Sequence, residues 1–103
     1  MYQLECLPIA MRDMVEIARY ISQELYNPQA AEKLANEMVE AAEKLTMFPY
    51  SKAIHFTQKP LMHEYRRLVV RNYIMFYWVN ELDKTIIIAR VIYARRDFDK
   101  LLP

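Results

Sequence analysis

The chain has 103 residues, of which 54% are hydrophobic and 26% are charged, and its formal net charge is +1. This composition excludes a disordered chain and predicts one folded domain over residues 1–103. No apolar run approaches the roughly 18–20 residues that a transmembrane helix needs, so we expect no membrane association. The N-terminus lacks the features of a signal peptide, and the single Cys6 cannot form an internal disulfide. We therefore expect a cytoplasmic protein.

The first half of the chain predicts a short strand followed by two helices. Residues 2–7 read as the strand and end before a proline that suits the start of a helix. Between residues 9 and 26 apolar side chains recur at helical spacing, and polar ones, Asp13 among them, occupy the other face. Pro28 suits the first position of a second helix, which extends to about residue 47. Because the connection is short, we expect an antiparallel helical hairpin.

The second half predicts a sheet, preceded by a loop over residues 50–61. Three runs rich in β-branched and aromatic side chains cover residues 65–70, 73–82 and 85–93. The connections between these runs are so short that they allow only antiparallel neighbours. The expected fold class is therefore α+β, with the N-terminal strand and the α-helical hairpin packed on an antiparallel β-meander.

Both faces of the predicted meander are apolar. In the middle strand, one face carries Tyr73, Met75, Tyr77 and Val79, and the other carries Ile74, Phe76 and Trp78. In the last strand, Ile87, Ala89, Val91 and Tyr93 oppose Ile86, Ile88, Arg90 and Ile92. One helical hairpin covers a single face, and residues 97–103 are too few to hide the other. We therefore expect an uncovered apolar face that serves as a binding surface.

Several kinds of active site find no support in the sequence. The chain contains no glycine, which excludes glycine-rich phosphate loops and the dinucleotide-binding fingerprint. His55 and His63 have no cysteine near them and form no metal-ligand pattern. Neither Ser22 nor Ser51 lies in a nucleophile elbow. We accordingly expect neither a metal ion nor a cofactor.

The distribution of charge is a stronger signal. Residues 1–51 contain four basic and eight acidic side chains, whereas residues 52–103 contain ten basic and five acidic ones. The arginines of the second half are Arg66, Arg67, Arg71, Arg90, Arg95 and Arg96. Rings suited to base stacking lie close to them in the sequence: Tyr65, Tyr73, Tyr77, Trp78 and Tyr93. Since guanidinium groups bind phosphates and carboxylates, this pattern favours a nucleic acid or an acidic protein segment as partner. In the alternative interpretation the rings form the core, and the arginines pair with Glu64, Glu81 or Asp97.

Several stretches of the chain together resemble one family. They are RDMVEIARYI at residues 12–21, Asn27-Pro28 with two alanines after them, LTMFP at 45–49, EYRRLVVRNYIMFYWV at 64–79 and IIIARVIYARRDF at 86–98. Over nearly its whole length the chain resembles the RelE/ParE superfamily of toxins from type II toxin–antitoxin modules. The resemblance implies a small toxin that a co-expressed antitoxin neutralises by wrapping its C-terminal segment around the sheet. We therefore expect a hetero-oligomer with an antitoxin.

The superfamily divides into two functions. RelE-like members cleave messenger RNA in the ribosome without a metal ion, and ParE-like members poison DNA gyrase. The arginine that often follows the tyrosine matching Tyr73 in RelE-like toxins is Ile74 here, and the C-terminal Tyr or His of the ribonuclease site is missing. Arg95 does match the arginine after the last strand. The resemblance thus favours a gyrase poison, and the alternative is a ribosome-dependent mRNA endoribonuclease with Arg66, Tyr93 and Arg95 as its catalytic residues.

The residues expected to contact the antitoxin or the target are Arg66, Arg67, Arg71, Trp78, Arg90, Arg95 and Arg96. Whether the protein is an enzyme stays open at this point. A third interpretation is a non-toxic RNA-binding adaptor, whose expression alone would leave growth unchanged.

Overall fold

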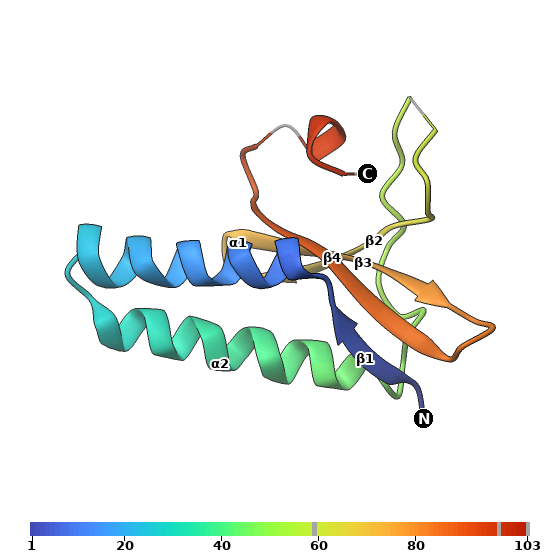
Figure 1. Ribbon diagram of the computed structural model, residues 1–103, viewed down its shortest axis with the longest axis horizontal. Coiled ribbons are helices and arrows are strands. Elements are labelled where there is room, and N and C mark those ends of the chain that lie inside the picture. Colours follow the sequence, from blue (N-terminus) through green and yellow to red (C-terminus); the bar gives the residue numbers. More distant parts are fainter. Residues whose placement is uncertain (59, 97, 103) are drawn as a thin grey trace.

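A computed structural model describes residues 1–58, 60–96 and 98–102 and shows two α-helices packed on one sheet (Figure 1). The strands are β1 (Gln3–Cys6), β2 (Arg66–Val70), β3 (Tyr73–Asn80) and β4 (Thr85–Tyr93), which lie in the order β1-β4-β3-β2. The helical segments are α1 (Pro8–Arg19), the π-helical turn η1 (Tyr20–Glu24), α2 (Pro28–Leu45) and the 3₁₀ turn η2 (Phe98–Lys100). The predicted α+β class is confirmed.

Local sequence decides where the helical hairpin begins and turns. Pro8 occupies the start of α1, because its fixed φ suits that position and its missing amide hydrogen is not needed there. The side chain of Asn27 accepts a hydrogen bond of 3.1 Å from the amide of Ala30 and so caps α2. The α-helical geometry of the first helix ends at Arg19, earlier than predicted, and η1 follows it. No helix in the described part of the chain is both long and apolar enough to cross a membrane.

The sheet combines the predicted meander with one parallel strand. β2, β3 and β4 pair antiparallel in sequence order, as predicted. β1 pairs with β4 in parallel, from Gln3 opposite Thr85 to Cys6 opposite Ile88. The predicted antiparallel meander is therefore confirmed, and the N-terminal strand, for which no direction was predicted, joins it in parallel. Parallel pairing is possible here because the hairpin and two further strands separate β1 from β4 along the chain.

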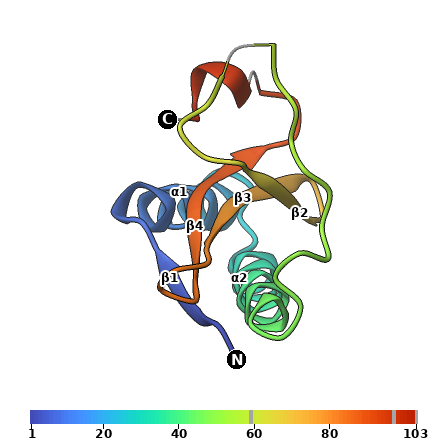
Figure 2. The same cartoon turned by 90° about the vertical axis from the view of Figure 1, so that its right-hand side faces the viewer.

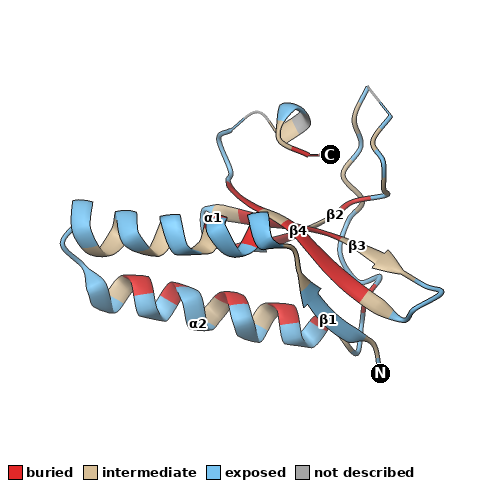
Figure 3. Cartoon of the chain, viewed as in Figure 1, coloured by how far each residue is buried: buried red, intermediate tan, exposed pale blue. Residues whose placement is uncertain are grey.

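The hairpin covers one face of the sheet, as predicted. Leu34, Met38 and Leu45 of α2 belong to the same buried cluster as Met75 of β3 and Ile86 of β4. Figure 3 shows the buried residues of α2 on the side turned toward α1 and the sheet. Burying each such side chain stabilises the fold by roughly 1.5–3 kcal/mol before conformational entropy is counted.

The opposite face of the sheet is covered as well, so the prediction of a bare apolar face is wrong. Its buried residues are Tyr65, Ile74, Phe76, Ala89, Ile92 and Leu102, with Leu7, Leu61, Trp78, Phe98 and Leu101 packed against them. Figure 2 shows the cover: the loop before β2 and the C-terminal segment lie on the side of the sheet away from α2. The prediction failed because neither segment has a regular period, although each brings large apolar side chains to the sheet.

A β-bulge corrects the predicted faces of β4. Phe76 pairs with Arg90, and the next residue of β3 pairs with Ile88, which leaves Ala89 as an extra residue on β4. Strict alternation placed Ile88 and Val91 on opposite faces, but both belong to the cluster beneath the hairpin. One inserted residue reverses the faces of all residues after it, because side chains alternate with a period of two.

Candidate functional site

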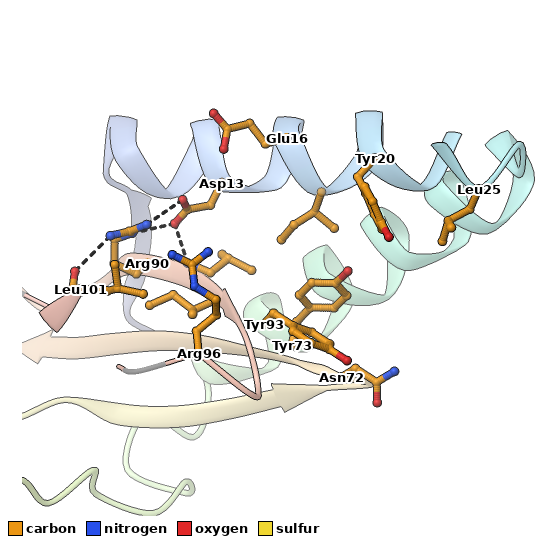
Figure 4. A pocket seen from close by; sticks show the side chains of 13 residues that line it. Asp13, Glu16, Tyr20, Leu25, Asn72, Tyr73, Arg90, Tyr93, Arg96 and Leu101 are labelled. Atoms are coloured by element: carbon orange, nitrogen blue, oxygen red, sulfur yellow. Dashed lines mark hydrogen bonds and ion pairs between the residues drawn. The ribbon is translucent and has the colours of Figure 1, made fainter. Parts of the chain in front are cut away.

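A groove of about 700 Å³ lies between the helical hairpin and the C-terminal end of β4 (Figure 4). Its volume falls within the range of sites that bind ligands. Tyr20 and Leu25 line it from the end of the first helical segment, and Tyr73 and Tyr93 line it from the sheet. Arg96 lines it from the turn after β4. The groove thus combines aromatic and apolar surface with a cationic side chain.

The wall at η1 depends on hydrogen bonds that span more residues than those of an α-helix. The amide of Leu25 donates to the carbonyl of Tyr20 at 3.2 Å, five residues back, and the amide of Asn27 donates to the carbonyl of Ile21 at 3.1 Å. Tyr26 then takes a positive φ of 53°, and the chain enters α2. In this wide turn Tyr20 and Leu25 both line the groove, and they are 53% and 55% exposed. Single π-turns occur frequently at functional sites.

Two tyrosines form the part of the groove that the sheet provides. Tyr73 and Tyr93 pair across β3 and β4, with ring centroids 5.7 Å apart and ring planes inclined by 56°. Burial raises the pKa of the Tyr73 hydroxyl, with smaller contributions from Tyr93 and Tyr20. The hydroxyl therefore stays protonated at neutral pH and can donate a hydrogen bond. The amide of Ala94 donates to the carbonyl of Asn72 at 2.9 Å and holds this end of the sheet together.

A buried ion pair forms the other end of the groove. Asp13 of α1, only 9% exposed, accepts hydrogen bonds from Nε and Nη2 of Arg90 at 2.8 and 3.0 Å. The same carboxylate accepts a hydrogen bond of 2.9 Å from the backbone amide of Val91. Val91 lies beyond Ile88, the last residue of β4 that pairs with β1. Nη1 of Arg90 donates to the carbonyl of Leu101 at 3.0 Å. The hydrogen bonds from Arg90 to Asp13 raise the pKa of the guanidinium. This pair therefore joins α1, β4 and the C-terminal segment.

This pair was not predicted, because helical periodicity placed Asp13 on the solvent side of the first helix. That prediction is wrong. The pairing of β1 with β4 ends at Ile88, and the Asp13 carboxylate accepts the hydrogen bond that the amide of Val91 donates on this edge of β4. The available signal was Arg90, a charged residue inside an otherwise apolar strand, which needs a buried partner. Tyr20 and Leu25 had no comparable signal, since a π-turn leaves no period in the sequence.

Arg66 and Arg67 are neighbours in β2 and lie on opposite faces of the sheet, because Arg66 pairs with Tyr77 of the cluster beneath the hairpin and Arg67 pairs with Phe76 of the opposite cluster. Arg66 donates to the carbonyl of Lys52 at 2.8 Å and lies 3.4 Å from the carboxylate of Glu64. Arg67 places its guanidinium 5.6 Å from the ring centroid of Phe98, and its buried Nε has no hydrogen-bond partner among the described residues. The ion pair between Arg66 and Glu64 agrees with the alternative interpretation of the sequence, in which the arginines pair with acidic side chains of the same chain. A binding role for either arginine stays a prediction.

Arg71 and Trp78 also contact other side chains of this chain. Nε and Nη2 of Arg71 donate to the two carboxylate oxygens of Glu37 in α2 at 2.6 and 2.7 Å. These hydrogen bonds lower the pKa of Glu37 and raise that of Arg71. The indole of Trp78 stacks on the imidazole of His63, with centroids 3.7 Å apart and planes inclined by 5°. Neither arrangement brings these residues to the groove.

Arg95 and Arg96 differ from the other arginines of the second half. Both are exposed in the turn after β4, and among the described residues neither guanidinium has a hydrogen-bond, ion-pair or ring partner. Asp97, a partner considered from the sequence, lies outside the described residues. Arg96 lines the groove and Arg95 is its neighbour in the chain, and guanidinium groups without a partner in the described part of the chain can bind carboxylates or phosphates.

The three residues considered for a ribonuclease site come from two ends of the sheet. Arg66 pairs with Tyr77, whereas Tyr93 pairs with Tyr73, four residues away along β3. Four residues at about 3.3 Å each correspond to about 13 Å along β3. Across the sheet, β2 and β4 are separated by two strand spacings of about 4.8 Å each. The structure therefore places Arg95 beside Tyr93 in sequence and space, with the backbone of Arg66 distant from both.

A second polar cluster, which was not predicted either, surrounds Glu81 at the β3–β4 turn. Tyr2 donates to both carboxylate oxygens at 2.8 Å, and Tyr50 and Lys84 donate to the same group. The bonds from Lys84, Tyr50 and Tyr2 lower the pKa of Glu81 to about 2, and the bond to Glu81 raises the pKa of Tyr50 to about 12. This cluster joins the N-terminus, the segment after α2 and the turn. In residues 1–58, 60–96 and 98–102, no group of three His, Cys, Asp or Glu side chains is placed to hold a metal ion.

Comparison with known proteins identifies the family. The fold is that of the RelE/ParE superfamily, as the sequence resemblance implied. A sequence model described as ParE toxin of type II toxin-antitoxin system, parDE, matches residues 4–98. Because this match covers most of the chain, the protein belongs to the ParE toxin family, and it is the toxin component of a type II toxin–antitoxin system. Comparison with curated protein sequences gives no match.

Solved structures agree with this assignment at the level of fold. A chain of the chromosomal ParDE system from P. aeruginosa has a TM-score of 0.73 and 22% identity, covering 92% of this chain and 98% of that one. A chain of the RelBE2 toxin–antitoxin complex from Mycobacterium tuberculosis has a TM-score of 0.57 and 21% identity, covering 89% and 96%. The isolated RelE toxin of E. coli has a TM-score of 0.58 and 16% identity, covering 98% and 95%. At these identities the likeness shows the fold alone.

Proposed function

We propose that this toxin arrests growth in the cytoplasm by binding and poisoning DNA gyrase, and that an antitoxin neutralises it in a hetero-oligomeric complex. Membership of the ParE family supports the target, and the toxin–antitoxin complexes among the similar structures support the partner. The observation that carries the proposal is the separation of Arg66 from Tyr93 and Arg95. Binding a target needs a complementary surface only, and the aromatic groove with its arginines offers one.

The chemistry of RNA cleavage explains why that separation matters. A metal-independent ribonuclease needs a proton acceptor, a proton donor and cations gathered at one phosphate. Removing a single stabilising donor from such a site typically costs about 10²–10³ in rate. Ile74 offers no cation, and the guanidinium of Arg66 is held by the carbonyl of Lys52 at the other end of the sheet.

The ribosome-dependent, metal-independent endoribonuclease is the second candidate. Two observations favour it: Tyr93 and Arg95 lie together at the exposed end of β4, and RelE toxins are among the similar structures. On this alternative Tyr93 serves the proton transfer, and Arg95 stabilises the phosphate.

Expression of the toxin without its antitoxin tests the proposal, when gyrase activity and transcript 5′ ends are both measured in the same culture. We expect growth arrest, accumulation of gyrase–DNA cleavage complexes and loss of supercoiling activity, with transcript 5′ ends unchanged. Arg95→Ala should weaken toxicity whichever target is correct, and Arg12→Ala, an exposed arginine of α1 away from the groove, is the matched control. Ribosome-dependent cuts within codons, with gyrase unaffected, would establish the second candidate instead.

A further inference from the structure

We propose that residues 98–102, the C-terminal strap, form an autoinhibitory cover that opens before the toxin binds its target, and that the sheet face beneath the strap contacts a target segment carrying hydrogen-bond acceptors beside an apolar side chain. This inference rests on the proposed function, because that function supplies the target. It concerns the sheet face that was predicted to be bare and that the strap and the loop before β2 cover (Figure 2).

Two polar groups on this face lack a partner. The hydroxyl of Tyr65 and Nε of Arg67 are buried, and neither has a hydrogen-bond partner in residues 1–58, 60–96 and 98–102. Tyr65 belongs to the same buried cluster as Leu102 of the strap, and the guanidinium of Arg67 lies 5.6 Å from the ring centroid of Phe98. A buried polar group without a partner costs free energy that contact with water would recover. The closed strap is therefore opposed by both groups.

A tyrosine on the other face of the sheet shows the contrast. Tyr77 lies in the cluster beneath the hairpin, and Tyr77 and Tyr65 are both 0% exposed. The hydroxyl of Tyr77 donates a hydrogen bond of 2.9 Å to the carbonyl of Pro49, whereas that of Tyr65 has no acceptor among the described residues. This difference is expected if the strap opens, because the open state gives the Tyr65 hydroxyl to water or to a partner.

The strap is attached by contacts that can separate while β4 keeps its own. Phe98 and Leu102 contribute apolar surface to the cluster, and the carbonyl of Leu101 accepts a hydrogen bond of 3.0 Å from Arg90. When the strap lifts, Arg90 still donates to both carboxylate oxygens of Asp13. Opening therefore exposes the sheet face without leaving a buried charge unpaired.

The chemistry of the uncovered face defines the partner. Arg67 donates through Nε, and burial raises the pKa of the Tyr65 hydroxyl, which therefore stays protonated and able to donate as well. Phe76 and Trp78 of the same cluster provide apolar surface beside these donors. Carboxylate or carbonyl oxygens next to an apolar side chain would satisfy both parts. Leu101 also lines the groove described above, so opening the strap would join the groove to this face.

Opening can be measured without any partner. The amides of Leu101 and Leu102 donate to the carbonyl of Phe98 at 2.9 and 3.0 Å inside the strap. A single helical turn is not stable in water without its packing contacts, so these amides exchange with solvent when the strap opens. The apparent affinity for the target rises in proportion to the open fraction while that fraction is small. Exchange rate and affinity should therefore change by the same factor.

Replacing Tyr65 by phenylalanine tests the proposal by stabilising the closed strap. The variant removes the hydroxyl that opposes closure. We expect about tenfold slower exchange of the strap amides, measured by NMR, and about tenfold higher Kd for purified gyrase, with no loss of stability in urea. Tyr77→Phe is the matched control, because it removes an equally buried hydroxyl that has an acceptor. This control should lose stability and leave strap exchange and Kd unchanged.

A second variant opens the strap instead. Leu102→Ala removes apolar contacts of the strap, so exchange should become about tenfold faster and Kd for gyrase about tenfold lower, although the protein is less stable. Leu34→Ala in α2 is the matched control, since Leu34 is 6% exposed and Leu102 is 7% exposed. Leu34→Ala should lose stability without tighter binding. If Leu102→Ala does not fold, Tyr65→Phe still decides the matter, because it adds no atom and breaks no hydrogen bond.

The possible outcomes separate the strap from the proposed function. Equal exchange in Tyr65→Phe and the unaltered toxin would overturn the strap, and so would faster exchange in Leu102→Ala without tighter binding. Failure of the unaltered toxin to bind gyrase would overturn the proposed function, while the exchange measurements would still decide whether the strap opens. Ribosome-dependent transcript cleavage that Tyr65→Phe weakens would assign the face to RNA and overturn the protein partner.

Discussion

Replacing Asp13 by alanine removes the acceptor of three hydrogen bonds at once. Arg90 then keeps its charge and its bond to the carbonyl of Leu101 but loses its counter-ion, and the amide of Val91 loses its acceptor. The side chains of Arg90 and Asp13 are only 16% and 11% exposed, so water replaces the carboxylate poorly. The substitution should therefore destabilise the contact between α1, β4 and the C-terminal segment.

The expected loss in the free energy of unfolding is about 3 kcal/mol. Breaking a buried pair by removing one partner costs roughly 3–5 kcal/mol, and the remaining exposure of Asp13 and Arg90 argues for the lower end of that range. With a urea m-value of about 1.5 kcal/mol/M, the unfolding midpoint should fall by about 2 M. Equilibrium unfolding in urea, followed by circular dichroism, measures this shift.

A double-mutant cycle separates this pair from other effects of the substitution. Asp13→Ala and Arg90→Ala together should destabilise the protein by about 2 kcal/mol less than the sum of the single changes. Glu16→Ala, an exposed acid one turn further along α1, is the control and should change stability by less than about 0.5 kcal/mol. A midpoint shift of less than about 0.5 M for Asp13→Ala, or additive single changes, would refute the reasoning.

Three further predictions concern exposed parts of the fold. Because the pKa of Glu81 is lowered to about 2 from an ordinary 4.5, its contribution to stability is present above pH 4.5 and lost as the pH falls toward 2, and Glu81→Gln should remove that dependence in urea titrations at stepped pH. Arg71→Ala breaks an exposed pair with Glu37, so it should cost no more than about 1 kcal/mol in the same assay, and a larger loss would contradict the assignment of the pair to the surface. His63→Ala uncovers the indole of Trp78, the only tryptophan, so its fluorescence emission should shift to longer wavelength, and an unchanged spectrum would argue against the stacked arrangement.

The sequence by itself determined the elements and the family. Proline and asparagine at the helix starts act through their own backbone and side-chain hydrogen bonds, which need no distant partner. The strands of the meander follow from runs of branched and aromatic residues joined by short turns, and short turns permit antiparallel pairing only. The same stretches carried the resemblance to the RelE/ParE superfamily, which the family match bears out.

Only the tertiary structure decided which surfaces are free. The bulge at Ala89 reversed the faces of the β4 residues on one side of it. The hydrogen bond from the amide of Leu25 to the carbonyl of Tyr20, five residues earlier, placed Leu25 in the lining of the groove. Asp13 became buried because the edge of β4 needed an acceptor after β1 ended. Each of these outcomes depends on atoms far apart in the sequence or on a single shift of register. Periodic patterns report which side chains are apolar, and the contacts between distant segments decide which of them remain exposed to a partner.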